Sequence, residues 1–292
     1  MRPTQFVFSF DPPSSPPSTE EALKVIKDQA RPAADVARIL DEAQVPNILW
    51  GGLPQGLVAR WNEHEKDVEF ITLDHLIFMA SNALIAAGFT PCSDPDCREV
   101  HSKNNDCPIA PVHFHIEAQY PQHGVLRVYA KSSHLWWLPD FEPGPPAADD
   151  PDLMLSNDSR LPPYVLRGFS GPWTELYPIK ILNPSSFTEA AWWLTFRDID
   201  YANGYEYRWT DMVLASMQSY THPHRTMERT LRPKFQAMWK EFDLPQEQRT
   251  RRTWDSANEL MYQMRDNNEL PPAPTNNWWG TVEAAKQNDC LI

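Results

Sequence analysis

The segment from Ile48 to His75 constrains the fold of this chain more strongly than any other. It reads ILWGGLPQGLVARWNEHEKDVEFITLDH, so an apolar run ends at Gly51 and Gly52, a short helical segment follows, and a second apolar run begins at Asp67. Short apolar runs bounded by turn residues are typical of buried strands. The segment therefore predicts two strands joined by a short helix, the beginning of a core that mixes helices and sheet.

Helices and further strands surround this segment. Ser18 and Glu21 form a capping box for a first helix, Pro32 suits the first turn of a second one, and Gly88 ends a later one. The predicted helices cover 19–29, 32–45, 53–61 and 76–87, and the predicted strands cover 47–52, 67–73, 112–120, 124–132 and 176–182. We therefore expect an α+β fold with a mixed sheet flanked by helices.

The pattern becomes wholly helical from Ser185 onward. Helical spacing of apolar residues recurs in 185–204, 209–220, 224–242 and 246–265, whereas 90–111 and 139–163 are polar or rich in proline and predict long loops. The sequence therefore predicts three parts: an N-terminal arm at 1–17, an α+β core at 18–184, and a C-terminal helical region and tail at 185–292.

The charge balance bears on partners and location. The net charge of −13 should repel a phosphate backbone, so the sequence argues against long nucleic acid as a partner. The chain has no run of 18 apolar residues, so no membrane span is expected. Four cysteines in a chain of this length, without a signal peptide, do not predict a disulfide framework. We therefore expect a soluble cytoplasmic protein with reduced thiols.

One local basic cluster opposes this overall acidity. We interpret most of its members as charged residues on solvated helix faces, although the cluster is compatible with the binding of a tRNA. Its members are Arg225, Arg229, Arg232, Lys234, Arg249, Arg251 and Arg252.

The second predicted strand begins with two acids, Asp67 and Glu69. Side chains alternate along a strand, so both carboxylates lie on one face, roughly 7 Å apart along the strand. Mg²⁺ binds carboxylates together with substrate phosphates, so the pair suits a metal-dependent phosphoryl-type transfer. The alternative is structural: Asp67 begins an edge strand and Glu69 faces water.

Together with the preceding glycines, these acids resemble the signature of the nucleotidyltransferase-fold superfamily. That signature has an apolar residue, two small residues, a short helix, and two acids that alternate with apolar residues. Trp50-Gly51-Gly52 and Asp67-Val68-Glu69-Phe70 stand in those places. More widely, the order of short sequence patterns in residues 30–200 is similar to that in a group of fungal nucleotidyltransferase-like proteins.

This resemblance implies a set of site residues. Asp67 and Glu69 would hold Mg²⁺ on the triphosphate of a nucleotide substrate, and a third carboxylate would come from a later strand. Glu117 in VHFHIE is the first candidate for the third ligand or base, with Asp140 and Glu142 as fallback choices. The remaining assignments are phosphate binding by Gly51 and Gly52, charge neutralisation by Arg60 or Lys66, and substrate binding by His113 and His115.

The chain also departs from the superfamily pattern. Fourteen residues separate Gly52 from Asp67, Lys66 replaces an apolar residue directly before the first acid, and Glu117 stands where aspartate is more usual. Three functions therefore stay open. The first is a metal-dependent transferase acting on a small molecule or a protein acceptor. The second is a catalytically degenerate interaction protein of the same fold, and the third is aminoacyl transfer from a charged tRNA in natural-product biosynthesis.

Cysteines and histidines gather between residues 92 and 115. The residues are Cys92, Cys97, His101, Cys107, His113 and His115. Thiolates and imidazoles are zinc ligands, but the spacing of the cysteines lacks the paired knuckles of strong zinc motifs. The sequence therefore favours a polar loop with buried thiols over a zinc site. His113 and His115 share one strand face with Glu117 and are interpreted either as substrate-binding groups or as packed side chains.

Overall fold

The computed structural model describes residues 18–62, 64–100, 107–199, 205–220, 226–242 and 251–273. The N-terminal arm predicted at 1–17 and the tail beyond 273 lie outside the described residues. The main sheet has the strand order β1-β2-β4-β3. Its strands are β1 (Ile48–Trp50), β2 (Val68–Thr72), β3 (Val112–His115) and β4 (Val125–Ala130). The predicted α+β class is confirmed.

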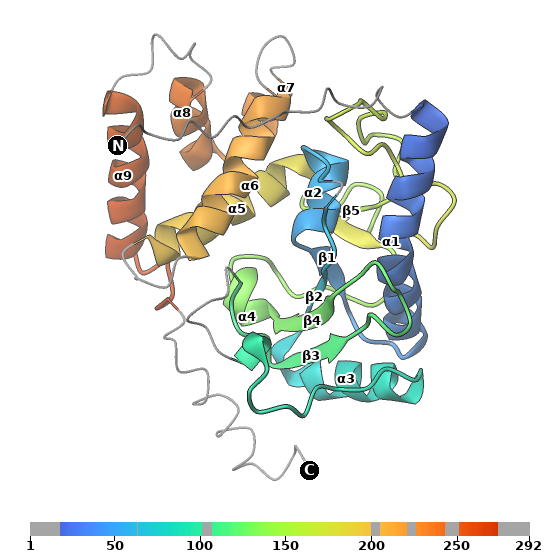
Figure 1. The fold of residues 1–292 in the computed structure, drawn as a ribbon. Coiled ribbons are helices and arrows are strands. Elements are labelled where there is room, and N and C mark those ends of the chain that lie inside the picture. The colour runs from blue at the N-terminus through green and yellow to red at the C-terminus, as the bar shows by residue number, and fades with distance from the viewer. Residues whose placement is uncertain are drawn as a thin grey trace, which may run out of the picture.

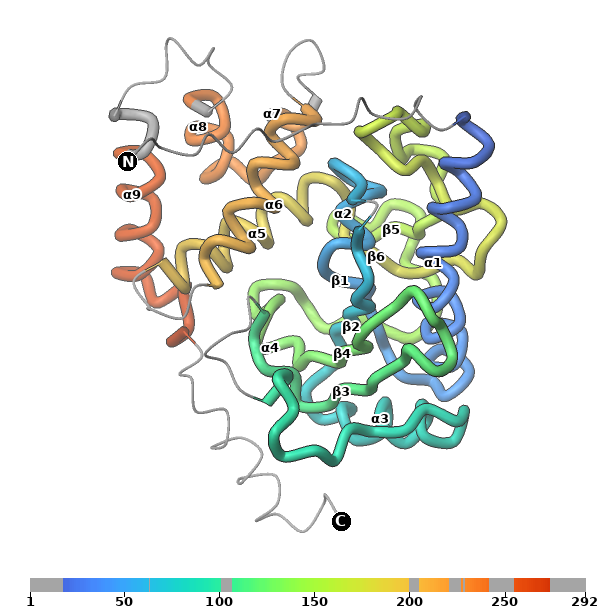
Figure 2. The backbone as a smooth tube through the Cα atoms, viewed as in Figure 1, coloured from blue at the N-terminus to red at the C-terminus, as the bar shows by residue number. Residues whose placement is uncertain are grey.

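The main sheet is mixed. β1 and β2 run antiparallel, β2 and β4 run parallel, and β4 and β3 run antiparallel. The short helix α2 (Gly52–Val58) lies between β1 and β2, as the sequence predicts. A second sheet pairs β5 (Leu153–Leu155) with β6 (Lys180–Leu182), and β6 contacts β1 (Figure 2). β5 lies in a segment that the sequence predicts to be a loop, because three residues are too short to reveal a strand period.

The helix α1 (Thr19–Glu42) is continuous, which corrects the prediction of two helices. Ser18 and Glu21 form the expected capping box, but Pro32 lies inside the helix instead of starting a new one. Proline removes one backbone hydrogen bond from a helix. The helix continues through it because one side of α1, rich in alanine, is buried from Ala30 to Ala37. α1 contacts β2 and the helix α3 (Ile77–Ala86), while α3 contacts β4.

The C-terminal helices are α5 (Pro184–Asp198), α6 (Tyr205–Tyr220), α7 (Thr226–Thr230), α8 (Pro233–Phe242) and α9 (Arg251–Asp266). These helices pack against one another, and α5 and α6 among them reach the main sheet. Figure 1 shows α5, α6, α8 and α9 together on one side of the molecule and α1 on the opposite side. Asn183 caps α5 by accepting a hydrogen bond from the Ser186 amide, with Pro184 in the first turn.

One aromatic cluster joins the sheet to these helices. The ring of Trp50 at the end of β1 packs on Phe187 of α5, on Trp209 of α6, and on His134. His134 belongs to α4 (Lys131–His134), a single turn directly after β4. The hydrophobic core therefore runs without interruption across the boundary predicted at residues 184 and 185. Within the described residues, no helix is long and apolar enough to span a membrane.

Candidate functional site

Glu69 of β2 and Asp67, which directly precedes β2, lie on the sheet face that α5 and α6 cover. Trp50, Glu69, Arg127 and His113 stand opposite one another on neighbouring strands, so their side chains share this face. Glu69 is 2% exposed and Arg127 is 3% exposed. The alternative of a solvated Glu69 is therefore wrong, because this carboxylate is buried beneath the helices.

Arg127 binds three carboxylates at once. Its Nη1 donates to Glu69 Oε1 at 3.0 Å and to Asp67 Oδ2 at 2.8 Å. Its Nε and Nη2 donate to the two oxygens of Glu99 at 2.5 and 2.9 Å, which is a bidentate pair. Glu99 comes from the turn η2 (Arg98–Val100), far from the strand in sequence.

A second arginine completes this ion-pair network, which comprises Asp67, Glu69, Glu99, Arg127 and Arg208. Arg208 of α6 donates to Glu69 Oε2 and to the sulfur of Cys107. Burial raises the pKa of the Cys107 thiol to about 12, so this cysteine is neutral. Both oxygens of Glu69 are therefore occupied by guanidinium groups, and the network joins three acids to two cations.

The other oxygen of Asp67 is also engaged. Asp67 Oδ1 accepts the backbone N–H of Val125 at 3.1 Å. The Asp67 amide donates to Glu65 Oε1 at 3.1 Å, which brings a further carboxylate beside the network. Burial and the neighbouring Glu69 raise the pKa of Glu65, while Arg208 opposes the rise.

Gly51 and Gly52 lie against these acids. Gly51 has a φ of 84°, and a Cβ there would overlap Glu69 Oε2 and come within 3.1 Å of Arg208 Nη2. A Cβ at Gly52 would overlap Glu65 Oε2. Both glycines are therefore required for the close approach of carboxylates to the backbone. The space beside them holds protein side chains.

The remaining predicted residues are placed apart from the acids. Glu117 follows the end of β3, its side chain is 56% exposed, and its carboxylate lies 3.9 Å from His115 Nδ1. Arg60 donates to Gln218 of α6 at 3.3 Å, and Lys66 is exposed. In the described part of the chain, no hydrogen bond or ion pair links Glu117 to Asp67 or Glu69.

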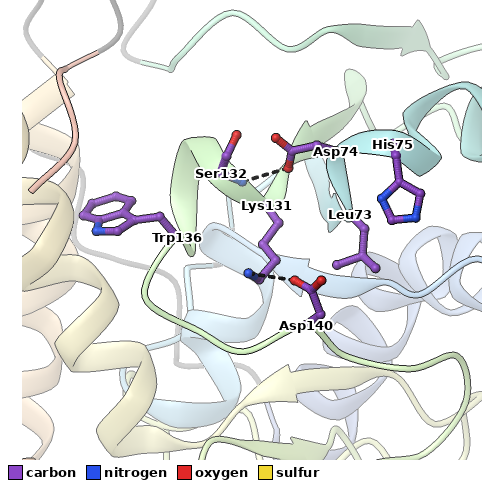
Figure 3. A pocket seen from close by; sticks show the side chains of 7 residues that line it. All are labelled: Leu73, Asp74, His75, Lys131, Ser132, Trp136 and Asp140. Atoms are coloured by element: carbon purple, nitrogen blue, oxygen red, sulfur yellow. Dashed lines mark hydrogen bonds and ion pairs between the residues drawn. The ribbon is translucent and has the colours of Figure 1, made fainter. Parts of the chain in front are cut away.

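The fallback acids Asp140 and Glu142 also lie elsewhere. Asp140 pairs with Lys131 at 3.0 Å, and the backbone carbonyl of Glu142 accepts from Lys180. Asp140 borders a cavity of about 270 Å³ at the ends of the parallel strands β2 and β4 (Figure 3). The cavity is lined by Leu73, Asp74, His75, Lys131, Ser132, Trp136 and Asp140. Asp74 closes one side by accepting the Ser132 amide at 3.0 Å.

The acids of β2 do not fit a Mg²⁺ site in this arrangement. Mg²⁺ requires carboxylate oxygens that face water and substrate phosphate. Here the oxygens of Asp67 and Glu69 accept N–H groups from two arginines and one backbone amide. On β4, the position opposite Glu69 carries Arg127, so the nearest group from a later strand is a cation.

Sequence reasoning missed both arginines and Glu99. One signal for Arg127 was present, because VLRVYA places a single charge in an otherwise apolar strand, and such a charge needs a buried partner. Nothing in the sequence identifies Arg208 or Glu99 as its neighbours, since these come from a helix and a turn that approach only in three dimensions.

The predicted basic cluster is partly used inside the protein. Arg232 pairs with Glu189 and Asp152, and Lys234 pairs with Glu269 at 2.5 Å. The Lys234 ammonium also lies 3.9 Å from the ring centre of Trp193. The side chains of Arg225, Arg249, Arg251 and Arg252 lie outside the described residues.

His113 and His115 lie beside Cys92 and Cys97. We call these four residues the cysteine–histidine cluster. Their ligand atoms all fall within 4.8 Å of one another. The four residues are the types that bind zinc, and together they have the donor set of a structural site. Cys107, which the sequence groups with them, points instead to Arg208, and His101 lies outside the described residues.

Comparison with known proteins gives no relative: no family model, no curated protein and no solved structure matches this chain.

Proposed function

We propose that the chain is a catalytically degenerate, nucleotidyltransferase-like protein that acts by binding a protein partner. The proposal rests on the sequence resemblance and on one observation. Arg127 stands opposite Glu69 on the neighbouring parallel strand and binds Asp67, Glu69 and Glu99 together. The acids that would hold a metal ion are thereby converted into an internal ion-pair network.

The energetics of this network favour a structural role. Breaking a buried ion pair by removing one partner costs about 3–5 kcal/mol, because a charge is left uncompensated. A Mg²⁺ ion could enter only if it displaced guanidinium groups from Asp67 and from the buried Glu69. That displacement would leave Arg127 and Arg208 buried beside a dication, so like charges would repel.

An exposed apolar helix supports the binding role. α3 reads IFMASNALIA and has no charged residue, yet only Ala80 and Leu84 are buried. Phe78, Met79 and Ile85 are each more than 40% exposed. An exposed apolar patch of this kind marks an interaction site in soluble proteins.

The charge of the chain indicates the chemistry of the partner. With a net charge of −13, two copies of the chain would repel each other. We therefore propose a partner that presents an apolar centre and a basic rim to α3. Electrostatic complementarity of this type would steer the association.

Nucleotide binding tests the loss of catalysis. We expect no Mg²⁺-dependent binding of a nucleoside triphosphate by calorimetry, either in the wild type or in Glu69→Gln. The matched control is Glu175→Gln, an acid whose ion pair with Lys27 is exposed. Mg²⁺-dependent binding in the wild type and the control that disappears in a folded Glu69→Gln variant would overturn the proposal and restore the metal-dependent transferase.

The tRNA hypothesis has less support. It depends on the basic cluster, but Arg232 and Lys234 already serve as internal partners of Glu189, Asp152 and Glu269. Aminoacyl transfer from a charged tRNA therefore stays a prediction of the sequence, with no contact among the described residues in its favour.

A further inference from the structure

We propose that Cys92, Cys97, His113 and His115 form a structural zinc site that fastens the loop after α3 to the main sheet. This inference does not depend on the proposed function. It rests on four residues from two segments whose ligand atoms converge, although their spacing in sequence gives no strong zinc motif.

The distances fit a tetrahedral site. Cys97 Sγ lies 3.5 Å from His113 Nε2 and 3.3 Å from His115 Nε2. Zinc bonds of about 2.3 Å to sulfur and 2.0–2.1 Å to nitrogen, at tetrahedral angles, place such a pair of ligand atoms about 3.6 Å apart. The two observed separations therefore leave room for one zinc ion with only small side-chain movements.

The backbone holds the ligands in place from both segments. His113 and His115 alternate on β3 and share one face, and their rings meet edge to face at 5.6 Å. The Cys92 amide donates to the carbonyl of His113 at 3.2 Å, which ties the loop to the same strand. Cys97 follows a turn in which its amide donates to Asp94, and it directly precedes η2.

Burial and charge also favour a metal ion over free thiols. Cys97 and His113 are buried, and the Cys97 sulfur faces the Nε2 atoms of both histidines. Without a metal, the site packs a thiol against imidazole rings, and a thiol is a weak hydrogen-bonding partner. Zinc would bind both and deprotonate the thiol.

A carboxylate stands behind one of the histidine ligands. His115 directs Nε2 toward Cys97, and its Nδ1 lies 3.9 Å from a carboxylate oxygen of Glu117. Carboxylates commonly orient zinc-binding histidines from this position. Glu117, which the sequence assigns to a magnesium site, is therefore placed to support the zinc ligand.

The site is a structural one. Four protein ligands close the coordination of zinc and leave no position for water or substrate, which distinguishes structural from catalytic sites. The ion would connect a loop that contributes Cys92 and Cys97 to the edge strand β3. The ion would add to the isolated bridge between Pro91 and Phe114 and to the hydrogen bond from the Cys92 amide to His113, which already join this loop to β3.

Metal analysis of the full chain, purified without a histidine tag, tests the site. We expect one zinc per chain by elemental mass spectrometry. After chelation, competition titration with Zn²⁺ should show an affinity reduced about 100-fold or more in Cys97→Ser and His115→Gln, since even outer partners of a ligand contribute 10–100-fold. Co²⁺ should give the visible absorption of a tetrahedral thiolate and imidazole site.

The matched controls are Cys107→Ser and His75→Gln, which remove the same residue types outside the cluster. Both should bind zinc as the wild type does. His115 is 43% exposed, so His115→Gln should fold even where Cys97→Ser does not. The proposal is overturned by a chain that binds no zinc, by equal affinity in His115→Gln and the wild type, or by a Cys92–Cys97 disulfide in protein handled under reducing conditions.

Discussion

At the scale of single residues, Arg127 determines what the acidic strand can do. Arginine keeps its charge at any pH at which the protein is folded, so Arg127 is a permanent cation among Asp67, Glu69 and Glu99. An asparagine or serine at this position would leave three acids together with only Arg208 to balance them. The same strand would then be a candidate metal site.

Replacement of Arg127 tests how much stability the ion-pair network provides. Arg127→Met should lower the free energy of unfolding by about 3–5 kcal/mol, because three buried or half-buried carboxylates each lose one ionic partner. Arg160→Met is the control, since the Arg160 side chain is 55% exposed and its pair with Asp158 should be worth less than about 1 kcal/mol. Denaturant titrations of both variants measure the difference. Similar losses in the two variants would show that the network is not a stabilising unit.

At the scale of secondary-structure elements, the sequence predicts helices better than it predicts very short strands. The capping box of α1 and the end of α3 before Gly88 lie where the pattern indicates. Pro32 misleads because burial of the alanine-rich side holds α1 together across the proline. β5 is missed because a three-residue strand is defined by its partner β6 and has no pattern of its own.

The exposed helix α3 gives a prediction at the same scale. Phe78→Asn with Ile85→Asn should change the free energy of unfolding by less than about 1 kcal/mol, because surface substitutions outside special sites have small effects. The pair should reduce the fluorescence of a bound apolar dye and abolish co-purification of the partner. The control is Val165→Asn with Leu166→Asn, two residues of similar exposure in a loop. Partner binding that survives in the α3 variant would show that this helix is not the interface.

At the scale of the whole molecule, the candidate site could be predicted only in part. Alternation along the chain places Asp67 and Glu69 on one face, where both meet Arg127, and it places His113 and His115 on one face of β3. The partners of these residues come from η2 and α6, and no local pattern records such long-range contacts. The cysteine–histidine cluster has the same origin, because its members converge through the pairing of the loop with β3.

The two clusters lie side by side, and Glu99 connects them. Glu99 follows Cys97 by two residues in the chain, and its carboxylate holds Arg127 through two hydrogen bonds. A zinc ion on Cys97 would therefore fix the turn that presents Glu99 to the ion-pair network. Loss of the ion should loosen that turn and weaken the Glu99–Arg127 pair.

Removal of zinc tests the coupling between the metal site and the Glu99–Arg127 pair. Chelation of zinc should lower the free energy of unfolding of the wild type, and the loss should be smaller in Glu99→Gln, because that variant has already lost the ionic contact that the metal helps to position. Non-additivity between neighbouring groups is typically 0.5–3 kcal/mol, which denaturant titrations with and without chelator can resolve. Glu175→Gln is the control and should lose as much as the wild type, since its pair with Lys27 lies on the surface. Equal losses in Glu99→Gln and the wild type would mean that the metal site and the ion-pair network stabilise the fold independently, although Glu99 lies only two positions after Cys97 in the chain.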